Sequence, residues 1–131
     1  MSAHREEFMV PGLSEPVSHF THVVRAGDYV YLSGQIAVRA DGSLVTNDFA
    51  AETRAVLDNI KAGVEAAGGT LADVCKTTVF LLNATLFEPM NVVYREYFSK
   101  PFPARSTIVA PLSNPDLRIE IEAVAYIPQN G

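Results

Sequence analysis

The chain has 131 residues, 48% of them hydrophobic and 19% charged, which fits one globular domain and argues against disorder. Its 10 basic and 15 acidic residues give a net charge of −5 without a cluster of Lys and Arg, which argues against a nucleic-acid partner. A single cysteine excludes an internal disulfide, and because no apolar run approaches the ~18 residues of a membrane span, we expect a soluble cytoplasmic protein with no membrane partner.

The N-terminal third predicts a lead-in followed by a β-hairpin. Residues 1–18 contain Pro11-Gly12 and Pro16 and are expected to be irregular. Thr21–Arg25 is predicted to be a strand, residues 26–28 a turn, and the β-branched and aromatic segment Tyr29–Ile36 the second strand. Alternation in this strand places Val30, Leu32, Gly34 and Ile36 on one face and Tyr29, Tyr31, Ser33 and Gln35 on the other.

A helix is expected after residue 48. Asp48 is a suitable N-cap, and Gly68-Gly69 supplies the C-terminal stop. Between them the apolar positions follow a helical period: Phe49, Val56, Leu57, Ile60 and Val64. The segment is therefore predicted to pack one face on the sheet.

The next two elements are a strand and a second helix. Val74–Leu82 predicts a strand in which Cys75 is expected to be a core thiol rather than a nucleophile. The helix start has two candidates, because residues 85–88 resemble a capping box whereas Pro89 suits a first helical position. In either case the helix is expected to end before Pro101.

Two strands, Arg105–Val109 and Leu117–Ile127, close the chain. In the last strand one face is apolar (Leu117, Ile119, Ile121, Ala123, Ala125) and the other is mixed (Arg118, Glu120, Glu122, Val124, Tyr126). The element order β-β-α-β-α-β-β predicts one α+β domain over residues 1–131, with a mixed β-sheet and both helices packed on one face. The mixed second face is typical of a subunit interface that could hold a ligand.

Few residues are candidates for chemistry. The sequence contains no phosphate-binding loop, dinucleotide fingerprint or nucleophile elbow. His19 and His22 form only a weak metal-ligand spacing, so surface or interface roles are expected for them and no metal site. Arg105 could grip a carboxylate with its planar guanidinium, and Glu120 could position a water or move a proton. From pattern alone, a surface arginine and a solvated edge carboxylate remain the favoured alternatives.

Several motifs taken together resemble one known family. The segments Ser33-Gly34-Gln35-Ile36, Val74–Phe80, Asn91–Phe98, Phe102–Ser106 and Ile119–Ala123 are similar, in order and spacing, to those of the RidA or YjgF-type reactive intermediate deaminases. The similarity extends from about residue 20 to residue 125. Order and spacing make this set of motifs far more specific than any one of them.

The resemblance implies a chorismate-mutase-like fold and a homotrimer with three clefts between subunits. It also implies hydrolysis of 2-aminoacrylate and related enamines or imines to 2-oxo acids and ammonia, with no cofactor and no metal. Arg105 would bind the substrate carboxylate and Glu120 would orient the attacking water. Ser33 and Asn91 match family positions that line the cleft. The chemistry needs little machinery beyond anion binding, a held water and proton transfer.

Two positions depart from the family pattern. Phe20 stands where deaminating members usually carry a tyrosine, after Ser18-His19, and Thr107 stands where members often carry a cysteine. Both are still expected to line the cleft. Besides a general deaminase, the sequence allows a pathway-specific deaminase of 2-aminomuconate-like compounds or a non-catalytic trimer that binds small carboxylates. Nuclease or translation-inhibitor activity is the last alternative, because the charge balance is acidic.

Overall fold

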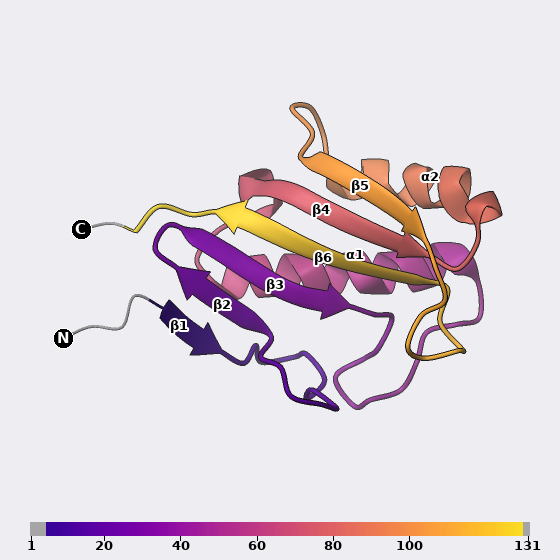
Figure 1. Cartoon of the computed structure of the whole chain (residues 1–131), viewed down its shortest axis with the longest axis horizontal. Helices are drawn as coiled ribbons and strands as arrows, with labels where there is room; N and C mark the ends of the chain where they lie inside the picture. The colour runs from indigo at the N-terminus through magenta and orange to yellow at the C-terminus, as the bar shows by residue number, and fades with distance from the viewer. Residues whose placement is uncertain (1–4, 130–131) are drawn as a thin grey trace.

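The computed structural model describes residues 5–129, and the first four residues of the predicted lead-in and the last two of the predicted domain lie outside them. Figure 1 shows the arrangement of its helices and strands. The strands are β1 (Arg5–Phe8), β2 (Val23–Ala26), β3 (Tyr29–Gln35), β4 (Val74–Leu81), β5 (Ala104–Val109) and β6 (Ile119–Tyr126). The helices are α1 (Phe49–Ala66) and α2 (Phe87–Tyr97), and the short 3₁₀ helices are η1 (Leu71–Asp73) and η2 (Ala84–Leu86).

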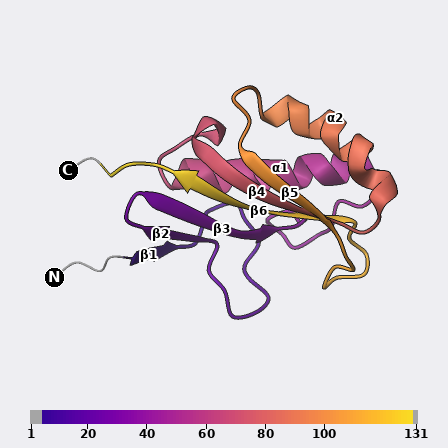
Figure 2. The same ribbon diagram turned by 45° about the horizontal axis from the view of Figure 1, so that its top comes forward.

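The strands form one sheet in the order β1-β2-β3-β6-β4-β5. All neighbouring strands are antiparallel except β4 and β5, which are parallel and joined through α2. Both helices lie on the same side of the sheet (Figure 2). The predicted α+β class, with a mixed sheet and two helices on one face, is therefore confirmed. None of the helices within residues 5–129 is both long and apolar enough to cross a membrane.

Local signals fix both ends of α1 as predicted. The Asp48 side chain accepts a hydrogen bond from the Ala51 N–H at 2.8 Å, which caps the first turn. At the other end Gly68 adopts a positive φ of 93°, and the N–H of Gly69 reaches the carbonyl of Val64 at 3.1 Å. This pattern satisfies carbonyls that the helix end leaves free, and it requires a residue that tolerates the left-handed region.

The start of α2 differs from both predicted alternatives. Asn83 caps the short helix η2 by accepting from the Thr85 N–H at 3.1 Å, and α2 follows directly from Phe87. Pro89 therefore lies in the first turn of α2, where its missing N–H would have had no intrahelical partner. Both predicted starts, at the capping box and at Pro89, are wrong.

The lead-in contains a strand that the sequence pattern did not predict. β1 pairs antiparallel with β2, with Glu7 opposite Val24. Three of its four residues are charged and exposed, so it has none of the apolar alternation that predicts a strand. Its position at the sheet edge makes such a composition acceptable. The prediction that residues up to 18 are irregular is therefore wrong for Arg5–Phe8.

A β-bulge in β3 changes which side chains share a face. Leu32 lies opposite Ala123 of β6 but Gln35 lies opposite Ile121, so three steps along β3 match two along β6. Gln35 is consequently buried, and Gly34 turns to the face away from the helices. The predicted faces hold for Tyr29 to Leu32 and are reversed for Gly34 and Gln35.

A second irregularity lies at the start of β4. Val74 pairs with Ala125 and Lys76 pairs with Val124, which leaves Cys75 outside the regular register. The thiol is exposed and donates to the Val124 carbonyl at 3.3 Å. The expectation that Cys75 is a core thiol is therefore wrong.

The core lies between the helices and one face of the sheet. The apolar face of β6 is buried as predicted, with Ile119, Ile121, Ala123 and Ala125 almost inaccessible, and the apolar positions of α1 pack on it. The other face is covered by no helix (Figure 2). Tyr29, Tyr31 and Tyr126 are each exposed by 45–47% there, which is a large aromatic surface for an isolated subunit.

Candidate active site

Arg105 is the centre of a first group of predicted site residues. It lies opposite Thr77 of β4, whose side chain is fully buried under α2. The Arg105 Nη1 donates to Asn91 Oδ1 of α2 at 2.8 Å. Thr107 lies two residues further along β5, on the same side of the strand, and is half-buried. Arg105, Asn91 and Thr107 are called the arginine cluster below.

Two aromatic rings of α2 hold the guanidinium of Arg105. Its Cζ lies 4.8 Å from the ring centroid of Tyr94 and 5.5 Å from that of Phe87, distances typical of cation–π contacts. The Tyr94 hydroxyl is hydrogen-bonded to Thr77 Oγ1 at 2.8 Å inside the core. Burial raises the pKa of the Tyr94 phenol, and the Thr77 bond and the Arg105 charge oppose that rise. Tyr94 is thus a neutral, fixed platform for the cation.

The sequence pattern does not predict this aromatic support, because it makes neither Tyr94 nor Phe87 a candidate site residue. Their spacing of seven residues, which places both side chains on one helix face, is the signal that could have found them.

The charge of Arg105 is not neutralised within the described residues. The ion pairs between residues 5 and 129 join Arg5 to Glu7, Arg54 to Glu96 and Arg118 to Glu52, and none includes Arg105. Its Nη1 is directed to Asn91 and Met90. Within residues 5–129, the Nε and Nη2 atoms of Arg105 make no hydrogen bond, so this edge of the guanidinium group is available to bind a carboxylate.

Glu120 is the centre of a second group, on the face that no helix covers. It lies on β6 opposite Phe80 of β4, and its carboxylate packs on the Gly34 backbone. A Cβ added at Gly34 would overlap the carboxylate Oε2 and stand 3.0 Å from Cδ, so only glycine leaves room for it. Burial raises the pKa of Glu120, and the charge of Glu122 adds to the rise. Such a carboxyl can exchange a proton closer to neutral pH than an ordinary glutamate.

Ser33 is the chain neighbour of Gly34, and Phe20 lines a cavity together with Gly34. Ser33 precedes Gly34 in the bulge, and its hydroxyl donates to the Thr21 carbonyl. Phe20 is 44% exposed. Glu120, Ser33 and Phe20 are called the carboxylate cluster below. The bulge is what brings Glu120 and the glycine together, because regular alternation would have pointed them apart.

The two histidines differ in their environment. His19 is exposed, as expected. His22 is buried, so the expected surface or interface role is wrong for it: its ring bonds to backbone groups of the lead-in. Within the described residues no three His, Cys, Asp or Glu side chains gather in a geometry that could hold a metal ion.

Within one chain the two clusters lie on opposite faces of the sheet. Arg105 of β5 pairs with Thr77 of β4, whose side chain points to the helices. Glu120 of β6 pairs with Phe80, three residues further along β4, whose side chain points to the opposite face. Because β5 and β6 lie on either side of β4, the Cα atoms of Arg105 and Glu120 are roughly 14 Å apart. Alternation in the last strand predicts that Glu120 lies on the mixed face, as it does, whereas the sequence pattern leaves the side of Arg105 undetermined.

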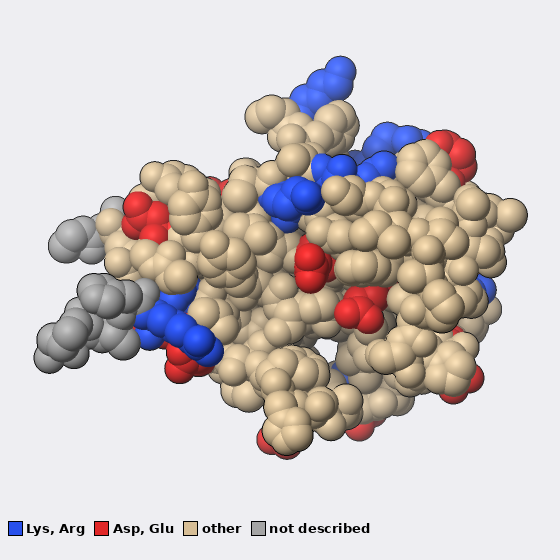
Figure 3. Space-filling model, in the orientation of Figure 1, with Lys and Arg blue, Asp and Glu red and all other residues tan. Residues whose placement is uncertain are grey.

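The face that carries Glu120 is mostly uncharged. Figure 3 shows it with isolated acidic side chains near the centre, over β6, and a hollow between the loops close to them. Half-exposed Tyr29, Tyr31, Tyr126 and Ile108 contribute to this surface. An apolar face with a few buried polar groups has the composition of a subunit interface.

These features describe a small α+β chain with an arginine outside the ion pairs of residues 5–129 on one side of its sheet and a half-buried carboxylate of raised pKa on the other. Comparison with known proteins identifies the family. The sequence profile described as Endoribonuclease L-PSP matches residues 13–127. The chain therefore belongs to this family, which is also called the YjgF/RidA/RutC family.

Individual relatives agree with this assignment. A RutC family protein of Pyrococcus horikoshii is 39% identical over 123 residues, which are 93% of this chain and 98% of the relative. The 2-iminobutanoate/2-iminopropanoate deaminase of Dermatophagoides farinae is 36% identical and covers 89% of this chain and 92% of its own length. The crystal structure of RidA from an Antarctic Psychrobacter species superposes with a TM-score of 0.88 at 32% identity, over 93% of this chain and 99% of that one. The fold is accordingly chorismate-mutase-like.

Proposed function

We propose that this chain hydrolyses imines and enamines of 2-oxo acids and that each active site forms where two copies of the chain meet. The observation that carries the proposal is the separation of the clusters: an unpaired Arg105 and a proton-exchanging Glu120 on opposite faces of one sheet. Two such faces complete one site only when they belong to different subunits. The tyrosine-rich face around Glu120 has the aromatic, largely uncharged composition of such a subunit interface. A homotrimer would contain three of these clefts.

In the proposed reaction the arginine cluster binds the substrate carboxylate. The free Nε and Nη2 edge of Arg105 matches the two oxygens of a carboxylate, while Asn91 and the flanking rings keep the guanidinium in place. The imine carbon then lies beside Glu120 of the neighbouring subunit. Holding the anion and the water together removes most of the entropic barrier of this intrinsically easy reaction.

Glu120 is proposed to accept and donate protons during the reaction. An enamine such as 2-aminoacrylate first takes a proton from solvent on its terminal carbon and becomes the iminium ion. Glu120 then takes a proton from water as its oxygen attacks the iminium carbon, and returns that proton to the nitrogen of the resulting carbinolamine. The C–N bond breaks as the carbinol hydroxyl loses its proton and becomes the carbonyl, and the released ammonia takes up that proton. One water is consumed, and the products are a 2-oxo acid and ammonium. The raised pKa of Glu120 suits a group that must both accept and donate.

Turnover of 2-aminoacrylate, generated in place from serine by a dehydratase, tests the proposal. The wild type should accelerate its loss, and Arg105→Ala should be about 100-fold slower, because two charge-assisted hydrogen bonds to the substrate are lost. Arg95→Ala is the matched control, since Arg95 is an exposed arginine on α2, the helix whose rings contact Arg105. If the wild type does not accelerate the reaction of this or any related imine, the proposal fails.

Subunit mixing tests the shared cleft. Arg105→Ala and Glu120→Gln should each be nearly inactive alone. Unfolding and refolding them together should restore about a quarter of the wild-type activity, because in a head-to-tail ring about one cleft in four then draws both intact residues from its two subunits. Activity that stays at the level of the single variants would contradict a composite site.

Two alternatives lead to different measurements. A carboxylate-binding protein without turnover would be stabilised by 2-oxo acids and release no product. An RNA-directed activity has less support, since the net charge is −5 and phosphate binding needs a basic surface.

A further inference from the structure

A cavity of about 720 Å³ opens beside the carboxylate cluster. Its walls come from three separate segments, which are residues 14–22, 34–44 and 113–115, with Asn59 of α1 at the back. Phe20 and Gly34 line it, and Gly34 is the residue on which the Glu120 carboxylate packs. The cavity therefore begins next to the proposed site of proton transfer. Its volume lies within the roughly 300–1,000 Å³ of small-molecule sites.

The larger part of the surface that lines this cavity is apolar. The side chains include Pro16, Val17, Phe20, Ile36, Val38, Leu44 and Pro115. Two of the polar wall residues direct their N–H groups at the backbone: the Asn59 amide donates to the carbonyls of Ile36 and Val38, each at 3.0 Å, and the Gln35 amide donates to the Ser33 carbonyl at 3.0 Å. The other polar wall residues are Ser14, Glu15, Ser18, His22, Ser113 and Asn114. The cavity accordingly suits an apolar group.

The charges of the wall residues also favour an apolar ligand. The residues that line the cavity include no Lys or Arg, and their one ionisable acid is Glu15, which is exposed. A carboxylate placed inside would lose its water without gaining a cationic partner, which is strongly unfavourable. The carboxylate common to all 2-imino acids has its partner in Arg105 of the proposed cleft instead.

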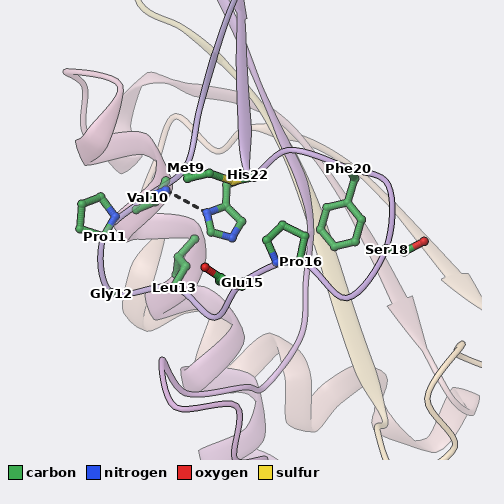
Figure 4. Close-up of a pocket in the computed structure, with 10 residues that line it drawn as sticks. All are labelled: Met9, Val10, Pro11, Gly12, Leu13, Glu15, Pro16, Ser18, Phe20 and His22. Atoms are coloured by element: carbon green, nitrogen blue, oxygen red, sulfur yellow. Dashed lines mark hydrogen bonds between the residues drawn. The ribbon is translucent and has the colours of Figure 1, made fainter.

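His22 holds the N-terminal wall of the cavity in position. Its Nδ1 accepts from the Val10 N–H at 2.8 Å, and its Nε2 donates to the Ser14 carbonyl at 2.8 Å. Nδ1 can accept only when it carries no hydrogen, so the ring is the neutral tautomer with hydrogen on Nε2. Figure 4 shows the ring enclosed by the loop that it ties down, with Phe20 on the segment that follows Pro16 and Ser18. The wall is thus preformed.

We propose that this cavity binds the substrate's own side chain and selects 2-imino acids with branched or aromatic apolar side chains over those with a second carboxylate. This inference rests on the proposed deaminase function and narrows its substrate class. It disfavours 2-aminomuconate-like substrates, which carry two carboxylates.

Competition between imines tests the selection. An amino acid oxidase generates the imines of leucine, glutamate and alanine in place, and semicarbazide trapping measures how much of each survives with and without the protein. The wild type should favour the leucine-derived over the glutamate-derived imine by at least about tenfold in kcat/KM, the size of discrimination that an apolar pocket provides. Equal rates or a preference for the dicarboxylic imine would overturn the proposal.

Variants that fill the cavity test whether it causes the substrate selectivity. Leu44→Phe adds a ring from the wall, and Ser113→Phe adds one from an exposed position whose replacement removes no core contact. Each should lower kcat/KM for the leucine-derived imine about tenfold and leave the alanine-derived 2-iminopropanoate within about twofold. Lys61→Phe, which adds the same ring on the exposed side of α1, should change neither. A fall that is equal for both substrates in the two folded filling variants would overturn the proposal.

Binding separates this inference from the proposed function. The melting temperature is measured with 4-methyl-2-oxopentanoate and with 2-oxoglutarate, the products of the leucine and glutamate imines. Greater stabilisation by the branched acid, lost in Ser113→Phe, supports the cavity assignment even if no imine is hydrolysed, in which case only the proposed function falls. Stabilisation by neither acid, or equally by both, would overturn the assignment.

Discussion

Replacing Gly34 by alanine is expected to displace the Glu120 carboxylate without unfolding the chain. The added Cβ would overlap Oε2 and stand 3.0 Å from Cδ, so the carboxylate must move by about 1 Å to restore ordinary nonbonded contact. A misplacement of about 1 Å at a reacting group can lower the rate about 100-fold. Gly34 has no positive φ, and the end of a glutamate side chain can move, so the free energy of unfolding should fall by only about 1 kcal/mol.

The assay is kcat/KM for 2-aminoacrylate, with thermal melting as the check on folding. Glu120→Gln provides the second edge of a double-mutant cycle, because Gly34→Ala should cost little more once the carboxylate is absent. Full activity in folded Gly34→Ala would refute the reasoning. So would an equal fold-loss in the Glu120→Gln background, since the methyl group would then act through something other than the carboxylate.

Two further predictions concern stability. Tyr94→Phe should lower the free energy of unfolding by about 1–3 kcal/mol, because it leaves the Thr77 hydroxyl buried without a hydrogen-bond partner. Adding Thr77→Val to the same chain should recover most of this loss. Urea unfolding of the single and double variants measures both effects, and a double variant as unstable as Tyr94→Phe would contradict the reasoning. The raised pKa of Glu120 means that its ionised form is disfavoured in the fold, so its contribution to stability is greatest in acid and is lost as the pH rises through that pKa. Glu120→Gln should therefore melt above the wild type at about pH 8 but not at about pH 4, and a difference of the same size at both would contradict the assignment.

Features set by local sequence were predictable. The ends of α1 follow from a capping carboxylate at Asp48 and a glycine at residue 68, and both act within a few residues of their position. The apolar face of β6 follows from strict alternation. The motif resemblance, through order and spacing, also indicated the family that the comparisons show.

Features that depend on the partner strand could not be predicted from the sequence. The bulge between Leu32 and Gln35 depends on how β3 aligns with β6, and the local sequence of β3 carries no signal for it. The side of Arg105 was equally undetermined, because β5 has no contrast between an apolar and a polar face. The contact of its guanidinium with the rings of α2 can be inferred only when the parallel pairing with β4 is known.

The charged strand β1 has a consequence for how copies of the chain can associate. An edge strand offers unpaired N–H and C=O groups to any other strand, and sheets extended in this way grow into fibres. β1 is only four residues long, exposes Arg5, Glu6 and Glu7, and joins Arg5 to Glu7 along the strand at 2.6 Å. A second strand added there would have to desolvate those charges. Extension of the sheet through β1 is therefore disfavoured, even though the aromatic face is exposed.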